Sequence, residues 1–349
     1  MVFIAGINQN KIARGGEEAK NQQIVNYFFR NNINVDIIDT HQWKKRFFSI
    51  GCQLIKYVLF AKNQQIYLSL SYQSTLSLLK IFKLFRVAAK NNIYFFVVGG
   101  VFHKWLENNQ KQLALFKSLK AIYPESNQMV VGLRRLGLNN VTQISNIKFI
   151  PKLVINKDYS IIQFVFLSRI SPTKGADLIL KAVNKLNKNG FQKQFEVSFY
   201  GNFHDSIDNG YEKLFKTQIS KIYNIKYKGF LQLQNLTNYD VLSQYNVMLF
   251  PTFWEGEGYA GVLIDAFIAA LPVIATDWNH NKEIIHHNTN GILISPKSYE
   301  SLAEAMKILI ENKPLLKQLE RGAVKSVDLY DIDKVFMNLF QPKTQIPIV

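Results

Sequence analysis

The sequence predicts an α/β fold with two domains, each built around a parallel sheet. A chain of 349 residues is long enough for about two domains with separate cores. Short apolar runs, typical of buried strands, alternate with segments of helical periodicity over residues 1–144, and the alternation restarts at residue 161. The polar segment 145–160, which contains Pro151, separates the two series and is interpreted as a linker. We place the domains at residues 1–155 and 156–330.

In the first domain the apolar runs recur about every 25–30 residues, as expected where helices connect parallel strands. The predicted strands are Val2–Ile7, Ile33–Ile38, Ile66–Leu70, Ile93–Val98, Ala121–Tyr123 and Val141–Ile144. The predicted helices are Glu17–Arg30, Gln42–Ala61, Thr75–Ala89 and Ser126–Leu136.

The second series has the same alternation and ends in consecutive helices. Its predicted strands are Ile161–Leu167, Phe195–Tyr200, Ile225–Tyr227, Val247–Phe250, Val273–Thr276 and Gly291–Ile294. Its predicted helices are Ala176–Leu186, Gly261–Ala270, Tyr299–Glu311, Pro314–Ser326 and Asp331–Phe340. Pro251 ends one of these strands, and Pro272 separates a helix from the strand that follows it.

Positive charge is concentrated in the first half of the chain. Residues 1–150 carry 20 Lys and Arg against 6 Asp and Glu, whereas residues 151–349 carry 22 against 19. The resulting charges of +14 and +3 add to +17 for the whole chain. Such an imbalance indicates an anionic partner for the basic half, such as lipid head groups, a lipid-linked diphosphate or nucleic acid. No nucleic-acid-binding motif is present, so we expect no nucleic-acid partner.

Two segments of the first domain, Gln42–Ala61 and Thr75–Ala89, mix basic residues with large apolar residues at helical spacing. They either lie at an anionic membrane surface, with apolar side chains inserted, or pack as ordinary amphipathic helices. The pattern leaves both interpretations open.

The cysteine content and the signal and membrane segments bear on the cellular compartment of the protein. Cys52 is the single cysteine, which excludes an intrachain disulfide and fits a reducing environment. No secretory signal or membrane-spanning segment is recognised. We therefore expect a cytoplasmic protein that rests at most on the inner face of the cell membrane.

The most informative stretch is VMLFPTFWEGEGYAGVLIDAFIAALPVIATDW at residues 247–278. It predicts a strand, an acidic glycine-containing loop, a helix and a second strand, which together form a βαβ unit. Loops at the carboxyl ends of such strands face the ligand crevice. Glu257 and Asp265 would lie roughly 12 Å apart if both were helical. That separation suits two contacts on one elongated ligand.

A second candidate loop carries two cations. Arg169 follows the predicted strand Ile161–Leu167, and Lys174 lies just before the next helix. Two cations beside a helix N-terminus form a suitable site for a diphosphate.

Two further candidates lie in the first domain. The pair Gly15-Gly16 precedes the first helix and lets backbone N–H groups approach a phosphate, although an ordinary tight turn explains it equally well. His103 follows the strand Ile93–Val98 and either contacts an acceptor, acts on a proton or is structural.

With these motifs in place, the sequence resembles the retaining GT-B glycosyltransferases of family 4, of the type that builds bacterial polysaccharides and capsules. FLSRISPTKGADLILKAV resembles the family's arginine–lysine loop, and EGYAGVLIDAFIAALPVIATDW resembles its two-acid motif. The resemblance covers residues 160–330 well and the first half mainly by its layout. It implies two Rossmann-like domains facing across a cleft, with the C-terminal helix 331–349 packing back on the first domain.

The resemblance also implies roles for individual residues. Arg169 and Lys174 would bind the donor diphosphate, Glu257 would contact the transferred sugar, and Asp265 would contact the ribose. The backbone from Gly258 through Tyr259, Ala260 and Gly261 to Val262 would add phosphate contacts. Gly15 and Gly16 would also contact the donor nucleotide sugar. Three departures are present: Asp265 replaces the second Glu, Ser168 replaces a common glycine, and Ala270 replaces another.

The function expected from this resemblance is metal-independent transfer of a hexose from a UDP- or GDP-linked sugar to a saccharide or lipid-linked acceptor. The anomeric configuration would be retained, and no cofactor would be needed. The pair Asp331 and Asp333 resembles the Asp-x-Asp of metal-dependent transferases, but it opens the last predicted helix, where capping explains it.

Two alternative functions were weighed. The segment 256–261 fits G-x-G-x-x-G, and Asp277 lies about where a ribose-binding acid would be, which is typical of an NAD(P)-dependent oxidoreductase. In that interpretation Glu257 would repel the pyrophosphate and the two cations would have no role. The other alternative is an inactive GT-B scaffold or binding subunit of a glycosylation complex.

Overall fold

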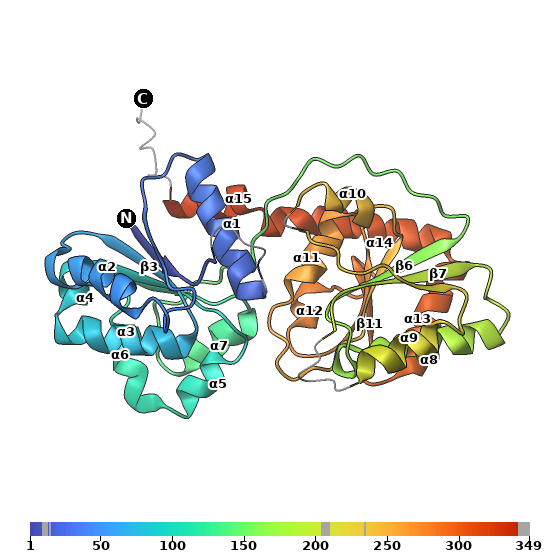
Figure 1. Cartoon of the computed structure of the whole chain (residues 1–349), viewed down its shortest axis with the longest axis horizontal. Coiled ribbons are helices and arrows are strands. Elements are labelled where there is room, and N and C mark those ends of the chain that lie inside the picture. The colour runs from blue at the N-terminus through green and yellow to red at the C-terminus, as the bar shows by residue number, and fades with distance from the viewer. Residues whose placement is uncertain (9–12, 14, 204–209, 234, 341–349) are drawn as a thin grey trace. The chain divides into compact units, whose positions relative to one another are not determined.

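The computed structural model describes residues 1–349 except 9–12, 14, 204–209, 234 and 341–349 (Figure 1). The chain forms two compact units, one of Met1–Phe149 together with Asp331–Val349 and one of Ile150–Tyr330. Each unit contains one parallel sheet with helices on both faces, which confirms the predicted α/β class. The division falls after Phe149, where the sequence interpretation placed it after residue 155.

The first unit contains a five-stranded sheet with the order β2-β1-β3-β4-β5, in which every pair is parallel. Its strands are β1 (Val2–Ala5), β2 (Asp36–Asp39), β3 (Gln65–Ser69), β4 (Asn92–Phe96) and β5 (Ala121–Tyr123). Apolar side chains of these strands are buried on both faces, as expected for a parallel sheet covered by helices.

Helices cover the two faces of this sheet unequally. One face carries α2 (Phe47–Phe60), α3 (Tyr72–Leu84), α4 (Val87–Lys90), α5 (Phe102–Glu107), α6 (Leu113–Lys117) and α7 (Asn127–Arg135). The opposite face carries α1 (Gly16–Arg30) and α15 (Ile332–Phe340). Phe336 of α15 is buried, and its ring centroid lies 5.2 Å from that of Tyr27. Residues 341–349, which were expected to extend this packing, lie outside the described residues.

The second unit contains a six-stranded parallel sheet with the order β11-β10-β9-β6-β7-β8. Its strands are β6 (Ile162–Leu167), β7 (Phe195–Tyr200), β8 (Ile225–Tyr227), β9 (Val247–Phe250), β10 (Val273–Thr276) and β11 (Gly291–Ile294). The chain enters at β6, proceeds to β7 and β8 on one side, and then crosses to β9 on the other. The strand order therefore reverses between β6 and β9.

Two layers of helices enclose the second sheet. One core cluster involves α8 (Ala176–Lys188), α9 (Tyr211–Ile219), α13 (Tyr299–Glu311) and α14 (Lys313–Ser326). The other involves α10 (Asn238–Leu242), α11 (Gly261–Ile268), α12 (Asn281–Ile284) and residues of α14. Figure 1 shows α8, α9 and α13 gathered in one part of this unit, apart from α11 and α12.

Two sequence predictions about local structure were wrong. Val141–Ile144 forms no strand, because only Val141 bridges to Ile122 in the sheet. The predicted helix Thr75–Ala89 is broken by Arg86, whose φ of 53° is left-handed and ends the helical hydrogen bonding between α3 and α4. His103, which was expected to follow the strand Ile93–Val98, lies inside α5, a helix that the sequence did not predict. Among the described residues, no helix has the length and apolar character needed to span a bilayer.

Candidate functional site

The candidate site lies where the strand order of the second sheet reverses. β6 and β9 are parallel neighbours, paired through Phe164 with Val247 and Val165 with Met248. Their carboxyl ends therefore meet at one edge, and the loops 168–175 and 251–260 leave the sheet side by side. A reversal of strand order opens a crevice between such loops, which is where ligands bind in open α/β sheets.

Glycines allow the loop after β6 to approach its neighbours closely. Gly175 has a φ of 86°, and a Cβ there would lie 2.3 Å from the carbonyl oxygen of Pro251. The backbone N–H of Phe253 donates to the carbonyl of Thr173 at 2.9 Å, which ties the two loops together. These contacts bring Lys174, which ends the short helix Pro172–Lys174, against the acidic loop.

Lys174 and Glu257 form a buried ion pair. Nζ of Lys174 lies 2.6 Å from Oε2 of Glu257, and each side chain is 9% exposed. Burial lowers the pKa of Lys174, Glu257 opposes this shift, and the nearby charge of Arg169 adds to it. The structure thus brings together the cation and the carboxylate that the sequence placed 83 positions apart.

Thr252 holds the Glu257 carboxylate in place. Its buried hydroxyl donates to Oε2 of Glu257 at 2.8 Å and accepts from the backbone N–H of Trp254 at 3.3 Å. The carbonyl of Thr252 accepts a hydrogen bond from the hydroxyl of Thr276 on β10. Two donors, the Lys174 ammonium and the Thr252 hydroxyl, therefore fix the position of Oε2.

The indole of Trp254 contacts both cations. The Arg169 guanidinium carbon lies 5.3 Å from the ring centroid, and Nζ of Lys174 lies 4.4 Å from it. These distances are typical of cation–π contacts. Within the described part of the chain, Nε of Arg169 is buried without a hydrogen-bond partner. The Nε–H of Arg169 is thus a donor to which no described protein atom offers an acceptor.

The acidic loop is fastened to the loop after β10. The indole N–H of Trp278 donates to the carbonyl of Trp254 at 2.8 Å. The Asn279 amide donates to the carbonyls of Glu255 and Glu257 at 3.2 and 3.1 Å. A Cβ on Gly256 would lie 2.6 Å from the Trp254 ring, so a glycine there lets the loop fold over the indole. The loop is therefore held at several points around the ion pair.

The helix that follows the loop begins without a side-chain cap. Gly258 lies half-buried before it, Ala260 occupies the N-cap position, and Gly261 and Val262 form the first turn of α11. The first N–H groups of a helix have no intrahelical partners, and Ala260 has no side-chain oxygen to accept from them. Tyr259 is buried, with its hydroxyl 3.3 Å from that of Tyr330. The uncapped helix end is available to an anion.

Asp265 lies in the interior, on the second turn of α11. It is 6% exposed, and its Oδ1 accepts a hydrogen bond from the Tyr239 hydroxyl at 2.5 Å. Burial and the Asp265 carboxylate raise the pKa of Tyr239 well above its ordinary value, so the hydroxyl stays protonated and donates. Glu257 lies before α11, so Glu257 and Asp265 are not both helical. The separation of roughly 12 Å expected for two helical positions therefore does not apply.

Three predicted residues belong to the first unit. Gly15 and Gly16 are exposed at the start of α1, and a Cβ on either would meet no atom within 4 Å. His103 is 8% exposed, and a Cβ on Gly132 of α7 would lie 2.7 Å from its ring. His103 therefore packs closely between α5 and α7.

The paired acids at the start of α15 have local partners. Oδ1 of Asp331 accepts from the backbone N–H of Asp333 at 2.9 Å, and Asp333 pairs with Arg30 of α1 at 2.5 Å. These contacts cap the helix and attach it to α1.

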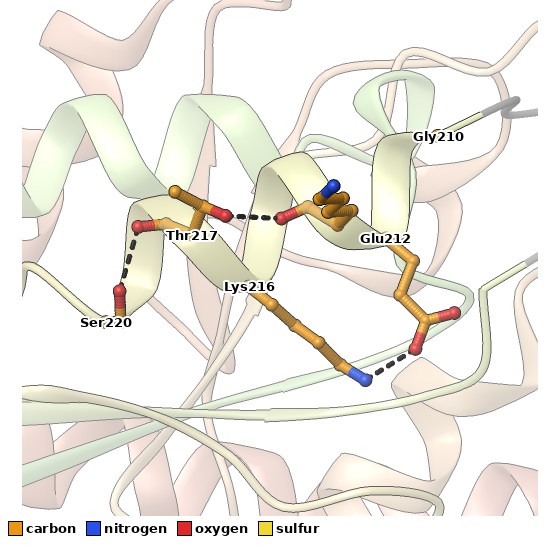
Figure 2. Close-up of a pocket in the computed structure, with 6 residues that line it drawn as sticks. Gly210, Glu212, Lys216, Thr217 and Ser220 are labelled. Carbon is orange, nitrogen blue, oxygen red and sulfur yellow. Dashed lines mark hydrogen bonds and ion pairs between the residues drawn. The ribbon is translucent and has the colours of Figure 1, made fainter.

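A surface hollow of about 600 Å³ lies elsewhere in the second unit. Figure 2 shows that its lining side chains come from one helix, α9, where Glu212 pairs with Lys216 at 2.5 Å. It shares no residue with the loops after β6 and β9, and it offers no arrangement of side chains from several elements. The hollow therefore lies apart from the Lys174–Glu257 pair and has no part in the site at the strand ends.

Sequence reasoning missed Thr252, Trp254, Asn279 and Tyr239. Thr252 and Trp254 follow directly after β9 at the reversal of strand order, so their position in the chain could have identified them. Asn279 and Tyr239 reach the acidic residues only through the packing of other elements, for which the sequence carries no local signal.

The chain is similar in sequence to known proteins. Residues 145–326 match the model of the family described as glycosyl transferases group 1. The poly(ribitol-phosphate) alpha-N-acetylglucosaminyltransferase of Staphylococcus aureus (strain COL) is 24% identical over 273 residues, which are 74% of this chain and 52% of that protein. The chain thus spans about half the length of this curated relative.

Two solved structures cover almost the whole chain. Anabaena Alr3699/HepE in complex with UDP has a TM-score of 0.71 at 13% identity, covering 97% of both chains. A sucrose-phosphate synthase from Thermosynechococcus elongatus has a TM-score of 0.70 at 14% identity, covering 97% of this chain and 96% of that one. At this identity they bear on the fold alone, and the GT-B fold class expected from the sequence is confirmed.

Proposed function

Because the chain belongs to the glycosyl transferases group 1 family, we propose that it transfers a sugar from a nucleotide-sugar donor to a saccharide or lipid-linked acceptor. The anomeric configuration of the sugar is retained, and the product is part of a cell-surface polysaccharide or glycoconjugate. The hydroxyl of the acceptor forms the new glycosidic bond as the sugar–phosphate bond breaks. The nucleoside diphosphate leaves, and the acceptor proton is released.

The observation that carries this proposal is the pairing of Lys174 with Glu257 beside Arg169, at the reversal of strand order. Breaking a sugar–phosphate bond places negative charge on the phosphate and positive charge on the sugar. A site for this reaction therefore needs fixed cations and a carboxylate a short distance apart, and this is the arrangement found here. One well-placed donor contributes about 3–4 kcal/mol to such a transition state.

Each residue has a distinct role in the proposal. Arg169 donates its unsatisfied Nε–H to a diphosphate oxygen. The Lys174 ammonium, which pairs with Glu257, also stabilises the negative charge of the diphosphate. Glu257 contacts the transferred sugar, and Asp265 contacts the ribose. The uncapped N–H groups from Gly258 to Val262 add phosphate contacts.

The cations and the helix end provide the charge neutralisation that a metal supplies in other transferases. We therefore propose a metal-independent reaction, so chelation by EDTA should leave the rate unchanged.

The donor class is proposed from the relatives. The S. aureus relative is named as an N-acetylglucosaminyltransferase acting on poly(ribitol phosphate), and the HepE structure contains UDP. Both support a UDP-linked sugar over a GDP-linked one. We propose a polysaccharide or lipid-linked saccharide as the acceptor and a cytoplasmic location, where nucleotide sugars are made. His103 is proposed to serve the acceptor side, and the Gly15-Gly16 turn is proposed to contact the donor nucleotide sugar.

An inactive scaffold is the second candidate, because a GT-B protein that lost its chemistry would keep the same fold. The joint presence of Arg169, Lys174, Glu257 and Asp265 favours activity, because a scaffold has no need for the whole set.

The test is a donor panel with product analysis. UDP-glucose, UDP-N-acetylglucosamine, UDP-galactose and GDP-mannose are each incubated with the protein, and release of the nucleoside diphosphate is followed with short saccharide acceptors. One donor should be consumed, and the anomeric proton of the product should show the configuration of the donor. Glu257→Ala should abolish release. Inversion of configuration would contradict the mechanism, and donor binding without release would favour the scaffold.

A further inference from the structure

The helix α2 carries an apolar stripe that faces away from the core. Phe48, Ile55 and Leu59 are exposed at 85, 52 and 47%, and their spacing of seven and four residues places them on one side of the helix. Ile50 and Tyr57, the two buried residues of α2, lie on the opposite side. A helix that is apolar all round is normally buried on all sides. No described residue of this unit covers Phe48, Ile55 or Leu59 on the outer face of α2.

The stripe continues onto the neighbouring helices. α2, α3 and α4 pack on the same face of the first sheet, as Figure 1 also shows. The Asn91 amide at the end of α4 donates to the carbonyl of Ala61 at the end of α2, at 3.0 Å. This contact brings the end of α2, where Phe60 is 74% exposed, next to the end of α4. Leu84, at the end of α3, is 77% exposed. We call the exposed apolar residues Phe48, Ile55, Leu59 and Phe60 of α2 and Leu84 of α3 the α2–α4 surface.

The charge around the α2–α4 surface is almost entirely positive. Residues 40–106 contain ten Lys and Arg and no Asp or Glu. All nine of those between residues 44 and 90 are exposed. Among the described residues, only Arg46 and Lys56 pair with an acidic side chain, in each case on β2. These exposed lysines and arginines do not contribute to the protein core. An apolar surface with a basic rim matches an anionic lipid bilayer, in which acyl chains lie beneath negative head groups.

We propose that the α2–α4 surface docks the first unit on an anionic membrane. Phe48, Ile55, Leu59 and Leu84 enter the acyl region, while the surrounding lysines contact head groups. This inference goes beyond the transferase function, and it holds whether or not the protein transfers sugars. A second copy of the chain is the other possible occupant, but two such basic faces would repel each other.

The single cysteine provides a direct probe. Cys52 is exposed on α2, four residues after Phe48 and three before Ile55, so it lies on the stripe itself. An environment-sensitive fluorophore attached there reports whether the stripe leaves water. The labelled protein is mixed with vesicles of phosphatidylcholine alone or phosphatidylcholine with phosphatidylglycerol, and unlabelled protein is sedimented with the same vesicles.

The expected result is sedimentation with the anionic vesicles at low salt and a blue shift of the fluorophore. Phe48→Ser with Leu59→Ser should weaken binding roughly tenfold or more. Lys83→Gln with Lys90→Gln should weaken it by roughly fivefold for each charge. Leu214→Ser, which removes a comparably exposed apolar residue from α9 of the other unit, should leave binding unchanged. Circular dichroism and the melting temperature establish that each variant is folded.

Three outcomes would overturn the proposal. The first is no sedimentation with anionic vesicles at low salt. The second is unchanged binding by the folded Phe48→Ser, Leu59→Ser variant. The third is a fluorophore shift that follows protein concentration without vesicles, which would assign the stripe to a second copy of the chain.

Discussion

Nζ of Lys174 lies 2.6 Å from Oε2 of Glu257, and the same oxygen accepts a hydrogen bond from Thr252. The pair joins the loops after β6 and β9, so it contributes to stability as well as to the proposed chemistry. Removing one member leaves the other charge buried and uncompensated, which typically costs about 3–5 kcal/mol.

We therefore predict that Lys174→Ala lowers the free energy of unfolding by about that amount, and that the double variant Lys174→Ala, Glu257→Ala costs less than the sum of the single variants. Urea denaturation of the four proteins measures the coupling. Lys226→Ala with Glu196→Ala is the matched control, because that Lys–Glu pair is exposed and should contribute under about 1 kcal/mol. Additive effects at Lys174 and Glu257 would show that the pair is not coupled.

Thr252→Val should impair catalysis without impairing the fold. It keeps the shape of the side chain but removes the hydroxyl that donates to Glu257. A hydrogen bond to a charged group contributes about 1.5–3 kcal/mol, so we expect kcat/KM to fall roughly tenfold or more. Thr252→Ser keeps the hydroxyl and should retain most of the rate. Equal rates for the Val and Ser variants would remove Thr252 from the mechanism.

Trp254→Ala should weaken donor binding, because the indole contacts both Arg169 and Lys174. Cation–π contacts contribute about 0.5–2 kcal/mol, which corresponds to a rise in donor Kd of roughly two- to thirtyfold. Trp254→Phe keeps an aromatic ring and should show the smaller effect. Calorimetric titration with the donor measures both, and tighter binding by Trp254→Ala would mean that the indole obstructs the site.

Stability should fall as the pH rises above 10, because tyrosines of the first unit are held protonated. Burial raises the pKa of Tyr123 to about 12, and the neighbouring Tyr94 adds to this. A pKa raised in the folded state contributes stability that is complete below the unfolded value of about 10 and is lost as the pH approaches 12. Tyr123→Phe should therefore flatten the decline in urea midpoint between pH 10 and 12. If Tyr123→Phe left the decline in urea midpoint unchanged, the raised pKa of Tyr123 would be contradicted.

Phe336→Ala should destabilise the first unit. The ring is fully buried and contacts Tyr27 and Phe96 from α1 and β4. Truncation of a buried Phe typically costs about 3–5 kcal/mol. Asp333→Asn removes only the exposed pair with Arg30 and should cost under about 1 kcal/mol. If both variants melted like the wild-type chain, α15 would contribute little to the packing.

The strands and long helices were predictable because burial leaves a strong local pattern. Phe195–Tyr200, Val247–Phe250 and Val273–Thr276 were predicted with the bounds that the structure has. The helices α5, α6, α9, α10 and α12 were not predicted, because each is at most nine residues long and is stabilised by tertiary packing. Arg86 also interrupts a continuous helical pattern, because its backbone is left-handed. The identity of its side chain does not predict that conformation.

The charged residues of the site were predictable, whereas their mutual geometry was not. Arg169, Lys174 and Glu257 were found because cations and acids follow strand ends in recognisable motifs. That Lys174 contacts Glu257, and that Thr252 and Trp254 support them, depends on β6 and β9 being neighbours. Strand order is a long-range property, so single motifs could not show it.

The measurement that tests the central claim most directly is calorimetric titration of UDP, GDP, ADP and NAD into the wild-type protein and Lys174→Ala, with Lys226→Ala as control. We predict that UDP binds the wild-type protein and Lys226→Ala, and that Lys174→Ala binds it at least roughly tenfold more weakly. At a hundred times its Kd, UDP should also stabilise the fold by about 2.7 kcal/mol. Binding of NAD alone, or equal UDP affinity with and without Lys174, would contradict the assignment of this site to a nucleotide-sugar diphosphate.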